Sequence, residues 1–194
     1  YLLIIASFIS FYEFNKLIKK IFKKKKNKII LTNIFSFIYL FFFIYAGYSY
    51  YNTLSLIFIL TICIFSDTGG YLVGKLIGGK KLTKISPNKT VSGSIGSFVF
   101  SILPAVIFLL ISKNENDYAI IINYNSNLFV LIIICLLLSL LCQLGDLFIS
   151  FFKRKAKVKD TGSLLPGHGG LLDRIDGLIF VLPLTFILEN IFLI

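Results

Sequence analysis

Long apolar runs separated by short polar segments dominate this sequence. A helix that spans a membrane needs about 20 mostly apolar residues. Six stretches meet this description, at residues 1–18, 29–49, 54–77, 91–112, 127–150 and 175–194. The third is the least regular, because Asp67 and five glycines interrupt it within SDTGGYLVGKLIGG. The pattern predicts an all-α, polytopic integral membrane protein with about six transmembrane helices in a single domain over residues 1–194.

The composition agrees with this fold class. The chain is 57% hydrophobic and its mean hydropathy is +0.88, and a soluble domain of 194 residues could not bury so much apolar surface. The net charge of +11 would suggest nucleic acid as the partner of a soluble protein. Because the basic residues flank apolar runs here, we expect membrane lipids and an anionic substrate as partners, and no nucleic acid.

The positions of the basic residues predict an orientation. Segments 15–28, 75–90 and 153–174 hold all but one of the 20 lysines and arginines. Six consecutive spans place these segments on one side of the membrane, and basic loops stay in the cytoplasm. We therefore expect a multi-pass protein of the cell (inner) membrane whose active site faces the cytoplasm. Since the sequence begins at Tyr1 rather than Met, we also expect an N-terminally truncated domain.

Asp146 lies between two apolar runs, at or inside the edge of the bilayer. An unpaired carboxylate there would cost several kcal/mol, so Asp146 needs a cation. The cation is either a lysine in a structural salt bridge or a divalent metal ion. Asp173 follows 27 residues later, and a loop of that length can fold back to place both carboxylates on one ion. Mg²⁺ prefers oxygen ligands and usually takes one or two protein carboxylates together with phosphate oxygens.

A glycine-rich loop, LPGHGG, lies shortly before Asp173. Gly169 and Gly170 let backbone amides approach a ligand closely, and such amides ahead of a helix N-terminus can bind phosphate. The same glycines could instead form a plain tight turn. His168 could orient or protonate a phosphate, or make an ordinary hydrogen bond within the loop.

A third group of polar residues lies on the same predicted side of the membrane. Asp67 is a second acid at membrane depth, and Ser86, Lys89 and Thr90 surround a proline turn with hydroxyl and ammonium donors. These residues either contribute to a nucleotide site or form a helix N-cap beside solvated lysines. In the helix that follows, Gly93 and Gly96 are expected to permit close packing.

Other charged residues are expected to have simpler roles. Glu13 is expected to snorkel or to pair with Lys16, and we assign it no chemistry. The lysines of segment 16–28 are expected to set topology and to contact anionic lipid. Asp160 and Asp176 are expected to orient Lys159 and Arg174.

The residues from Ser150 to Asp176 carry a resemblance to a known family. They read Ser150-x-x-Lys153-Arg154, four residues, Lys159-Asp160-x-Gly162-x-x-Leu165-Pro166-x-His168-Gly169-Gly170-x-x-Asp173-Arg174-x-Asp176. Together with DTGGY and SPNKTVSG upstream, this pattern resembles the phosphatidate cytidylyltransferases, also called CDP-diacylglycerol synthases. The resemblance covers the chain from about Glu13 on. Family members commonly carry further N-terminal spans.

The resemblance implies a membrane enzyme of phospholipid biosynthesis, as a homodimer with a polar cavity open to the cytoplasm. It implies transfer of CMP from CTP to phosphatidic acid, which gives CDP-diacylglycerol and pyrophosphate. It also implies Mg²⁺ near Asp146 and Asp173, with K⁺ as a further cation beside it.

The candidate residues suit that reaction. The phosphate of the lipid is the nucleophile, so no Ser or Cys nucleophile is required, and the repulsion between two polyanions must be offset. Asp146 and Asp173 would bind the metal. The catalytic set is completed by Lys153, Arg154, Lys159, His168 and Arg174, and the expected substrate-binding residues are Asp67, Ser86, Lys89, Thr90, Ser150, Gly169 and Gly170.

Three other classes of function remain open at this point. A purely structural lipid-binding protein is one, although it would not need two aspartates at metal spacing. A related membrane nucleotidyltransferase or a lipid kinase would use the same ions with another lipid acceptor. An ion-coupled transporter would also hold acids within the membrane. Against a transporter, the acids gather at one face, and no paired broken helices occur at the midplane.

Overall fold

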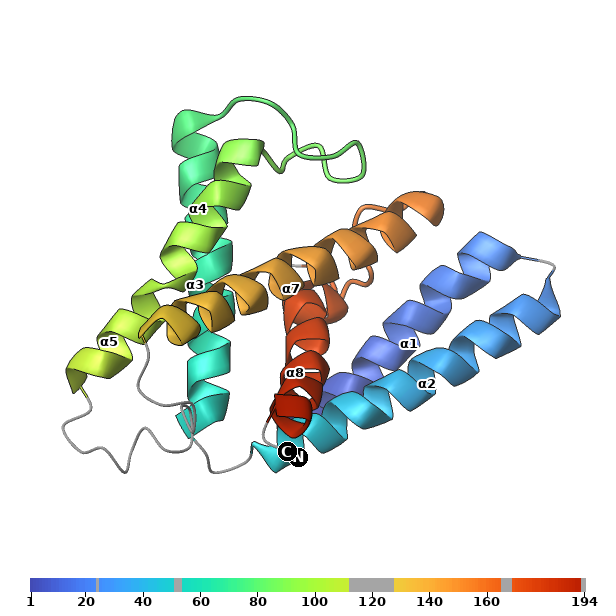
Figure 1. Cartoon of the computed structure of the whole chain (residues 1–194). Coiled ribbons are helices and arrows are strands. Elements are labelled where there is room, and N and C mark those ends of the chain that lie inside the picture. The colour runs from blue at the N-terminus through green and yellow to red at the C-terminus, as the bar shows by residue number, and fades with distance from the viewer. Residues whose placement is uncertain (24, 51–53, 112–127, 165–168, 193–194) are drawn as a thin grey trace. The chain divides into compact units, whose positions relative to one another are not determined.

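The computed structural model describes residues 1–23, 25–50, 54–111, 128–164 and 169–192. The helices within these ranges are α1 (Leu2–Phe22), α2 (Lys26–Ser49), α3 (Leu54–Ile77), α4 (Val91–Ser101), α5 (Leu103–Ile111), α7 (Leu128–Lys155) and α8 (Leu172–Phe192) (Figure 1). Each of the six predicted apolar stretches corresponds to a helix, and the fourth corresponds to α4 followed by α5. The all-α prediction is therefore confirmed.

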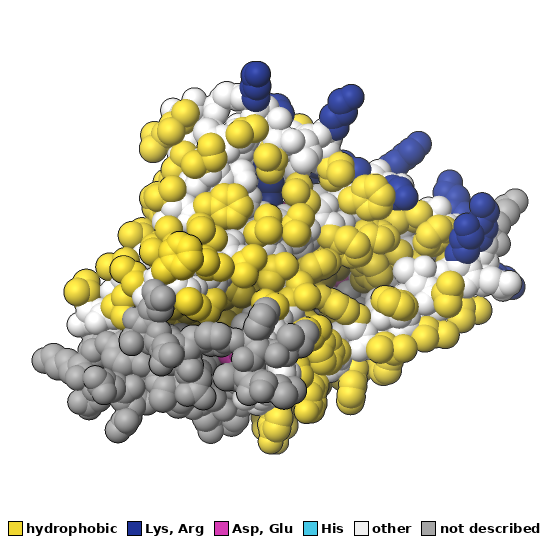
Figure 2. All heavy atoms as spheres, viewed as in Figure 1, with side chains coloured by type: hydrophobic (Ala, Val, Ile, Leu, Met, Phe, Trp, Pro, Cys, Tyr) yellow, Lys and Arg dark blue, Asp and Glu magenta, His cyan; other side chains and the backbone are white. Residues whose placement is uncertain are grey.

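Four helical stretches among the described residues are long and apolar enough to cross a membrane: Lys26–Ser49, Ser55–Ile77, Val91–Leu110 and Leu128–Lys155. Their outer surfaces carry large hydrophobic side chains, such as Phe35, which is 75% exposed, and Leu110, which is 78% exposed. In Figure 2, hydrophobic side chains cover the lengths of the helices, while lysine and arginine side chains gather at their ends. Such surfaces suit contact with lipid along the helices and with water at their ends.

The chain divides into two compact units. The first contains Tyr1–Ser49 and Gly145–Ile194, and the second contains Tyr50–Leu144. The long helix α7 therefore contributes its last turns to the first unit and its earlier turns to the second.

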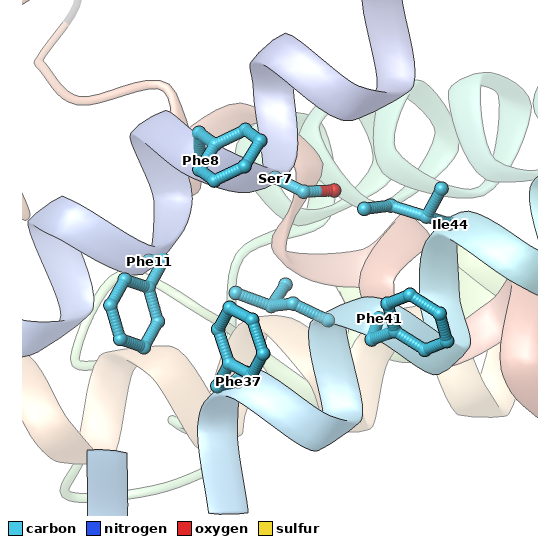
Figure 3. A pocket seen from close by; sticks show the side chains of 7 residues that line it. Ser7, Phe8, Phe11, Phe37, Phe41 and Ile44 are labelled. Carbon is cyan, nitrogen blue, oxygen red and sulfur yellow. The ribbon is translucent and has the colours of Figure 1, made fainter. Parts of the chain in front are cut away.

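In the first unit, α1 and α2 lie side by side, and α8 packs against both (Figure 1). Aromatic contacts join α2 to α8, including Phe42 and Phe186, whose ring centroids lie 5.9 Å apart. The hydroxyl of Tyr39 donates to the carbonyl of Ile179 at 3.0 Å. Between α1 and α2 is a small apolar cavity of about 70 Å³ (Figure 3), lined by Ser7, Phe8, Phe11, Phe37, Leu40, Phe41 and Ile44.

In the second unit, the predicted span over residues 54–77 corresponds to α3 with the same bounds. Helix α3 continues through Asp67 and the internal glycines to Ile77, and it ends before Gly78 and Gly79, whose φ angles are 65° and 101°. Helical glycine costs about 1 kcal/mol relative to alanine. The packing of α3 on α4 offsets that cost.

The glycines of α3 and α4 form the contact between these helices. A Cβ atom at Gly70 would lie 2.4 Å from Ser97 Oγ, and one at Gly93 would lie 2.7 Å from the carbonyl oxygen of Gly70. Small residues at these positions let two backbones approach closely, as is common between membrane helices. The prediction that Gly93 and Gly96 permit close packing is confirmed.

A buried polar ladder also joins helices of the second unit. Ser94 Oγ donates to Gln143 Oε1 at 2.5 Å, and Gln143 Nε2 donates to Ser139 Oγ at 3.4 Å. The hydroxyls of Ser139 and Ser66 are 2.8 Å apart. These bonds connect α3, α4 and the first part of α7 within apolar surroundings.

Candidate active site

The site begins where α7 ends. Its last turn holds Lys153, Arg154 and Lys155, and cations there are favoured by the helix dipole. The amide of Val158 donates to the carbonyl of Lys153 at 3.0 Å, and the amide of Lys157 donates to the carbonyl of Arg154 at 3.1 Å. Lys157 has a φ of 56°, the left-handed conformation that closes this type of helix end. The turn directs the chain back toward the beginning of α8.

Asp173 lies in the first turn of α8, and four donor groups lie within hydrogen-bond distance of its carboxylate. Its Oδ2 atom accepts from the backbone amide of Thr161 at 2.8 Å, the hydroxyl of Thr161 at 3.0 Å and the backbone amide of Gly170 at 3.1 Å. Its Oδ1 atom accepts from Lys153 Nζ at 2.7 Å, which is also a salt bridge. Asp173 therefore holds together the end of α7, the following loop and the beginning of α8.

The surroundings of Asp173 stabilise its charged form. Burial alone would raise the pKa of this carboxyl group, but the Lys153 ammonium and the amides of Thr161 and Gly170 outweigh it and hold the pKa below 3.8. Asp173 is thus a carboxylate at neutral pH, which is the form that binds a cation.

Glu13 is a component of the site that the sequence analysis missed. Its side chain is only 4% exposed, and it neither snorkels nor pairs with Lys16 as expected. Oε1 accepts from the amide of Leu171 at 3.1 Å, and Oε2 accepts from the amide of Leu172 at 2.9 Å and from the hydroxyl of Thr161 at 2.9 Å. Helix α1 is thereby tied to the beginning of α8. The only signal in the sequence was an acid inside an apolar run.

These bonds change the interpretation of the glycine-rich loop. The amides of Gly170, Leu171 and Leu172 donate to the chain's own carboxylates, Asp173 and Glu13, rather than facing a ligand. A Cβ atom at Gly170 would lie 2.1 Å from Thr161 Oγ1 and 2.5 Å from Glu13 Oε2. Gly170 is therefore needed for close packing around these two side chains. A substrate contact of Gly170 stays a prediction.

Asp146 lies on α7, where this helix touches α8. A Cβ atom at its neighbour Gly145 would lie 2.5 Å from the carbonyl oxygen of Asp176, so the two backbones are in close contact. Asp146 Oδ1 accepts from Ser150 Oγ at 3.2 Å, one helical turn further on. Asp146 thus lies next to the contact between Gly145 and Asp176, and Asp173 lies about one helical turn before it.

The basic residues of the motif differ in exposure. The side chain of Lys153 is 12% exposed and bound to Asp173. Arg154, Lys159 and Arg174 are exposed, so their positive charges can meet an anion from the surroundings. Gly169 is described with a φ of 84°, while His168 lies outside the described residues.

The remaining predicted residues belong to the second unit. Asp67 is exposed on α3, and its Oδ1 atom accepts a weak bond from Cys142 Sγ at 3.6 Å. Thr90 is the N-cap of α4, accepting from the amide of Gly93 at 3.0 Å. In the loop before it, the amide of Lys89 donates to the carbonyl of Ser86 at 3.1 Å. Thr90 thus has the structural role of an N-cap, and substrate binding by this segment stays a prediction.

The oxygen atoms at the α7–α8 contact fit a hard divalent cation. No group of three or more His, Cys, Asp or Glu side chains within the described part of the chain is arranged to hold a metal ion. Mg²⁺ does not require one, since one or two carboxylates plus phosphate oxygens and water complete its shell. Asp173 Oδ1 already accepts from one cation, Lys153 Nζ, and a carboxylate oxygen has two lone pairs.

Several bacterial proteins resemble the chain. A protein named phosphatidate cytidylyltransferase from Bacillus subtilis (strain 168) is 43% identical over 141 residues, which is 72% of this chain and 49% of that protein. Proteins of the same name from Staphylococcus haemolyticus (strain JCSC1435) and Staphylococcus aureus (strain COL) are 44% and 47% identical over 124 residues, 63% of this chain and 44% of each relative. The chain spans about half the length of the curated relatives it matches.

The match to a family model is more extensive. The model of the cytidylyltransferase family covers residues 1–192, which includes both units and all the predicted site residues. It includes Glu13 and α1 as well as the motif between Ser150 and Asp176. The chain therefore belongs to the cytidylyltransferase family.

Proposed function

We propose that the chain carries the catalytic site of a phosphatidate cytidylyltransferase, which transfers CMP from CTP to phosphatidic acid. The observation that carries the proposal is Asp173, a carboxylate kept charged by the Lys153 ammonium and the amides of Thr161 and Gly170 beside exposed basic residues, in a chain of this family. In the reaction, a phosphate oxygen of phosphatidic acid attacks the α-phosphorus of CTP. A new P–O bond forms, the bond to the β-phosphate breaks, and pyrophosphate leaves.

The proposed work of the protein is to hold two anions together and to stabilise the charge of the transition state. Asp146 and Asp173 would hold Mg²⁺, which, when bound, neutralises phosphate oxygens and polarises the α-phosphorus. Arg154 and Arg174 are exposed and can contact phosphates through two parallel hydrogen bonds each. Lys153 balances the charge of Asp173.

The finer details are also proposals. K⁺ would be a further cation beside Mg²⁺, and His168 and Lys159 would contact phosphates. Ser86, Lys89, Asp67 and Ser150 would contribute to substrate binding. About six spans would enclose a polar cavity open to the cytoplasm of an inner-membrane homodimer.

The distribution of basic residues supports an active site that faces the cytoplasm. Basic residues gather in the last turn of α1, at the beginning of α2 and in the last turn of α7, all within the first unit. The positive-inside rule assigns such ends to the cytoplasm, where CTP is found. Phosphatidic acid would enter sideways from the inner leaflet.

Incorporation of radiolabelled CTP into lipid tests the proposal. The full membrane protein is purified in detergent and supplied with phosphatidic acid, with and without Mg²⁺. We expect a labelled lipid product and released pyrophosphate only when all three components are present. ATP in place of CTP tests a lipid kinase, and a polyprenol phosphate in place of phosphatidic acid tests another acceptor. Transfer that prefers either of these, or no transfer at all, would contradict the proposal.

A further inference from the structure

Glu13 is the most buried carboxylate in the first unit for which the structure gives hydrogen-bond partners. It lies in α1, and its three donors lie 148 to 159 residues later in the sequence, at Thr161, Leu171 and Leu172. A charge buried in this way would destabilise the protein unless it were fully hydrogen-bonded. Its presence at this point therefore calls for a specific role.

The geometry excludes a direct part for Glu13 in binding substrate. Both of its oxygen atoms accept hydrogen bonds from the chain, and two of the donors are the amides that open α8. Gly162 and Gly170 close over it, since a Cβ atom at either would lie within 2.5 Å of a Glu13 oxygen. Glu13 is thus enclosed by the loop that it holds.

One hydroxyl links Glu13 to Asp173. Thr161 Oγ1 lies 2.9 Å from Glu13 Oε2 and 3.0 Å from Asp173 Oδ2. Because a hydroxyl has only one proton, it donates to one of the two carboxylates at a time. Glu13 and Asp173 therefore compete for the proton of Thr161, so a movement of Glu13 alters this competition.

We propose that Glu13 is a positioning residue, which fixes the beginning of α8 so that Asp173 is presented to the cation of the active site. This inference rests on the proposed function for its catalytic consequence. Carboxylates that orient a metal ligand through a hydrogen-bonding neighbour act in this way, and their loss typically costs 10- to 100-fold in metal affinity or activity.

Glu13→Gln is the most direct variant, because it keeps the size of the side chain. The amide group of glutamine has only one oxygen, so its NH₂ group must face a donor at Leu171 or at Leu172 and Thr161. We expect the Mg²⁺ concentration for half-maximal transfer to rise about 10- to 100-fold. Lys16→Gln, which removes the charge of an exposed side chain in the same helix, is the control and should behave as the wild type.

A second readout does not depend on activity. Hydrogen–deuterium exchange without Mg²⁺ or substrate should be faster in Glu13→Gln at peptides covering Leu171 and Leu172, and unchanged in α2. Thermal stabilisation by Mg²⁺ alone should also be smaller in the variant. A purely structural weakening of α1 would raise exchange throughout α1 and α2 and leave the Mg²⁺ dependence unchanged, which would overturn the proposal.

The outcomes separate this inference from the proposed function. If the wild type transfers no CMP, the proposed function fails, and exchange at Leu171 and Leu172 still decides whether Glu13 holds the loop. If Glu13→Gln matches the wild type in both Mg²⁺ dependence and exchange, the inference fails and the function stands. Where Glu13→Gln does not accumulate, Glu13→Asp keeps the charge but shortens the side chain, and the same shift in Mg²⁺ dependence is expected of it.

Discussion

The two units use buried glycine and buried polar atoms for different purposes. In the second unit, Gly70 and Gly93 bring two helix backbones together, and a ladder of neutral side chains joins the helices. In the first unit, Gly170 makes room for charged side chains, and Glu13 and Asp173 accept hydrogen bonds from a loop and from helix ends. The first arrangement packs helices against one another. The second fixes two buried carboxylates at the beginning of α8, where burial of their charge is unfavourable and is explained by a role in function.

The largest expected effect is the loss of CMP transfer when the carboxylates of the first unit are replaced. Asp173→Asn and Asp146→Asn should each lower CMP transfer by more than about 100-fold, because a stabilising interaction with the transition-state charge is lost. Both variants should still insert and fold. Transfer of labelled CTP, with Lys16→Gln as the control, measures the effect. Near-normal Mg²⁺-dependent turnover of Asp173→Asn would show that the metal assignment is wrong.

Substitution of glycine by alanine should harm the two units for different reasons. Gly170→Ala forces a methyl group to within 2.1 Å of Thr161 Oγ1, and Gly93→Ala forces one to within 2.7 Å of a backbone carbonyl. Overpacking of this kind costs about 1–3 kcal/mol in the free energy of unfolding. Only Gly170→Ala should also raise the Mg²⁺ concentration needed for half-maximal transfer, since it displaces the neighbours of Asp173.

Gly47→Ala is the control for both substitutions. The added methyl group would meet the end of the flexible Leu3 side chain at 2.5 Å, which can move aside. Thermal unfolding in detergent should therefore show a smaller loss than for Gly170→Ala or Gly93→Ala. Equal losses in all three variants would remove the distinction between the units.

The loss of folding stability at low pH should depend on Lys153. Because the pKa of Asp173 is held below 3.8 in the folded protein, its stabilising contribution is complete above pH 3.8 and is lost as the pH falls through the lower folded value. Lys153→Met removes the bonded cation, so the pKa of Asp173 should rise and the loss should begin at higher pH. Thermal unfolding between pH 7 and pH 3 measures this.

Lys155→Met is the matched control for this experiment. Lys155 is exposed, and its ammonium lies 4.4 Å from the centre of the Phe151 ring rather than against a carboxylate. Its replacement should leave the pH dependence of unfolding unchanged. An identical acid profile for Lys153→Met and the wild type would contradict the role assigned to the Lys153–Asp173 pair.

The smallest expected effect concerns the polar ladder of the second unit. Ser139→Ala breaks the bond to Ser66 on α3, which should cost about 0.6 kcal/mol, the average for a hydrogen bond between membrane helices. It also breaks the bond to Gln143 within α7. Ser101→Ala removes only a bond to Phe98 in its own helix and should cost less. Thermal unfolding compares the two, and CMP transfer should stay near normal in both. A large loss of transfer in Ser139→Ala would contradict a scaffold role.

The fold was largely predictable because hydrophobic runs of this length have few alternatives to a helix. The glycines made the pattern of α3 irregular because glycine propensity is a local quantity, whereas the packing of Gly70 on α4 is a tertiary one. The motif contains both Lys153 and Asp173, but only the structure shows that these two side chains are paired. The role of Glu13 was not predictable, because its partners lie 148 or more residues away.

The central claim is that Asp146 and Asp173 share one divalent cation. Mn²⁺ is a hard cation like Mg²⁺, and its anomalous X-ray scattering locates it without assumptions about the site. Crystals of the full protein grown with Mn²⁺ and CTP should show one strong anomalous peak at about 2.2 Å from a carboxylate oxygen of each aspartate, a typical metal–oxygen distance. A peak that contacts neither aspartate, or only one of them, would contradict the claim.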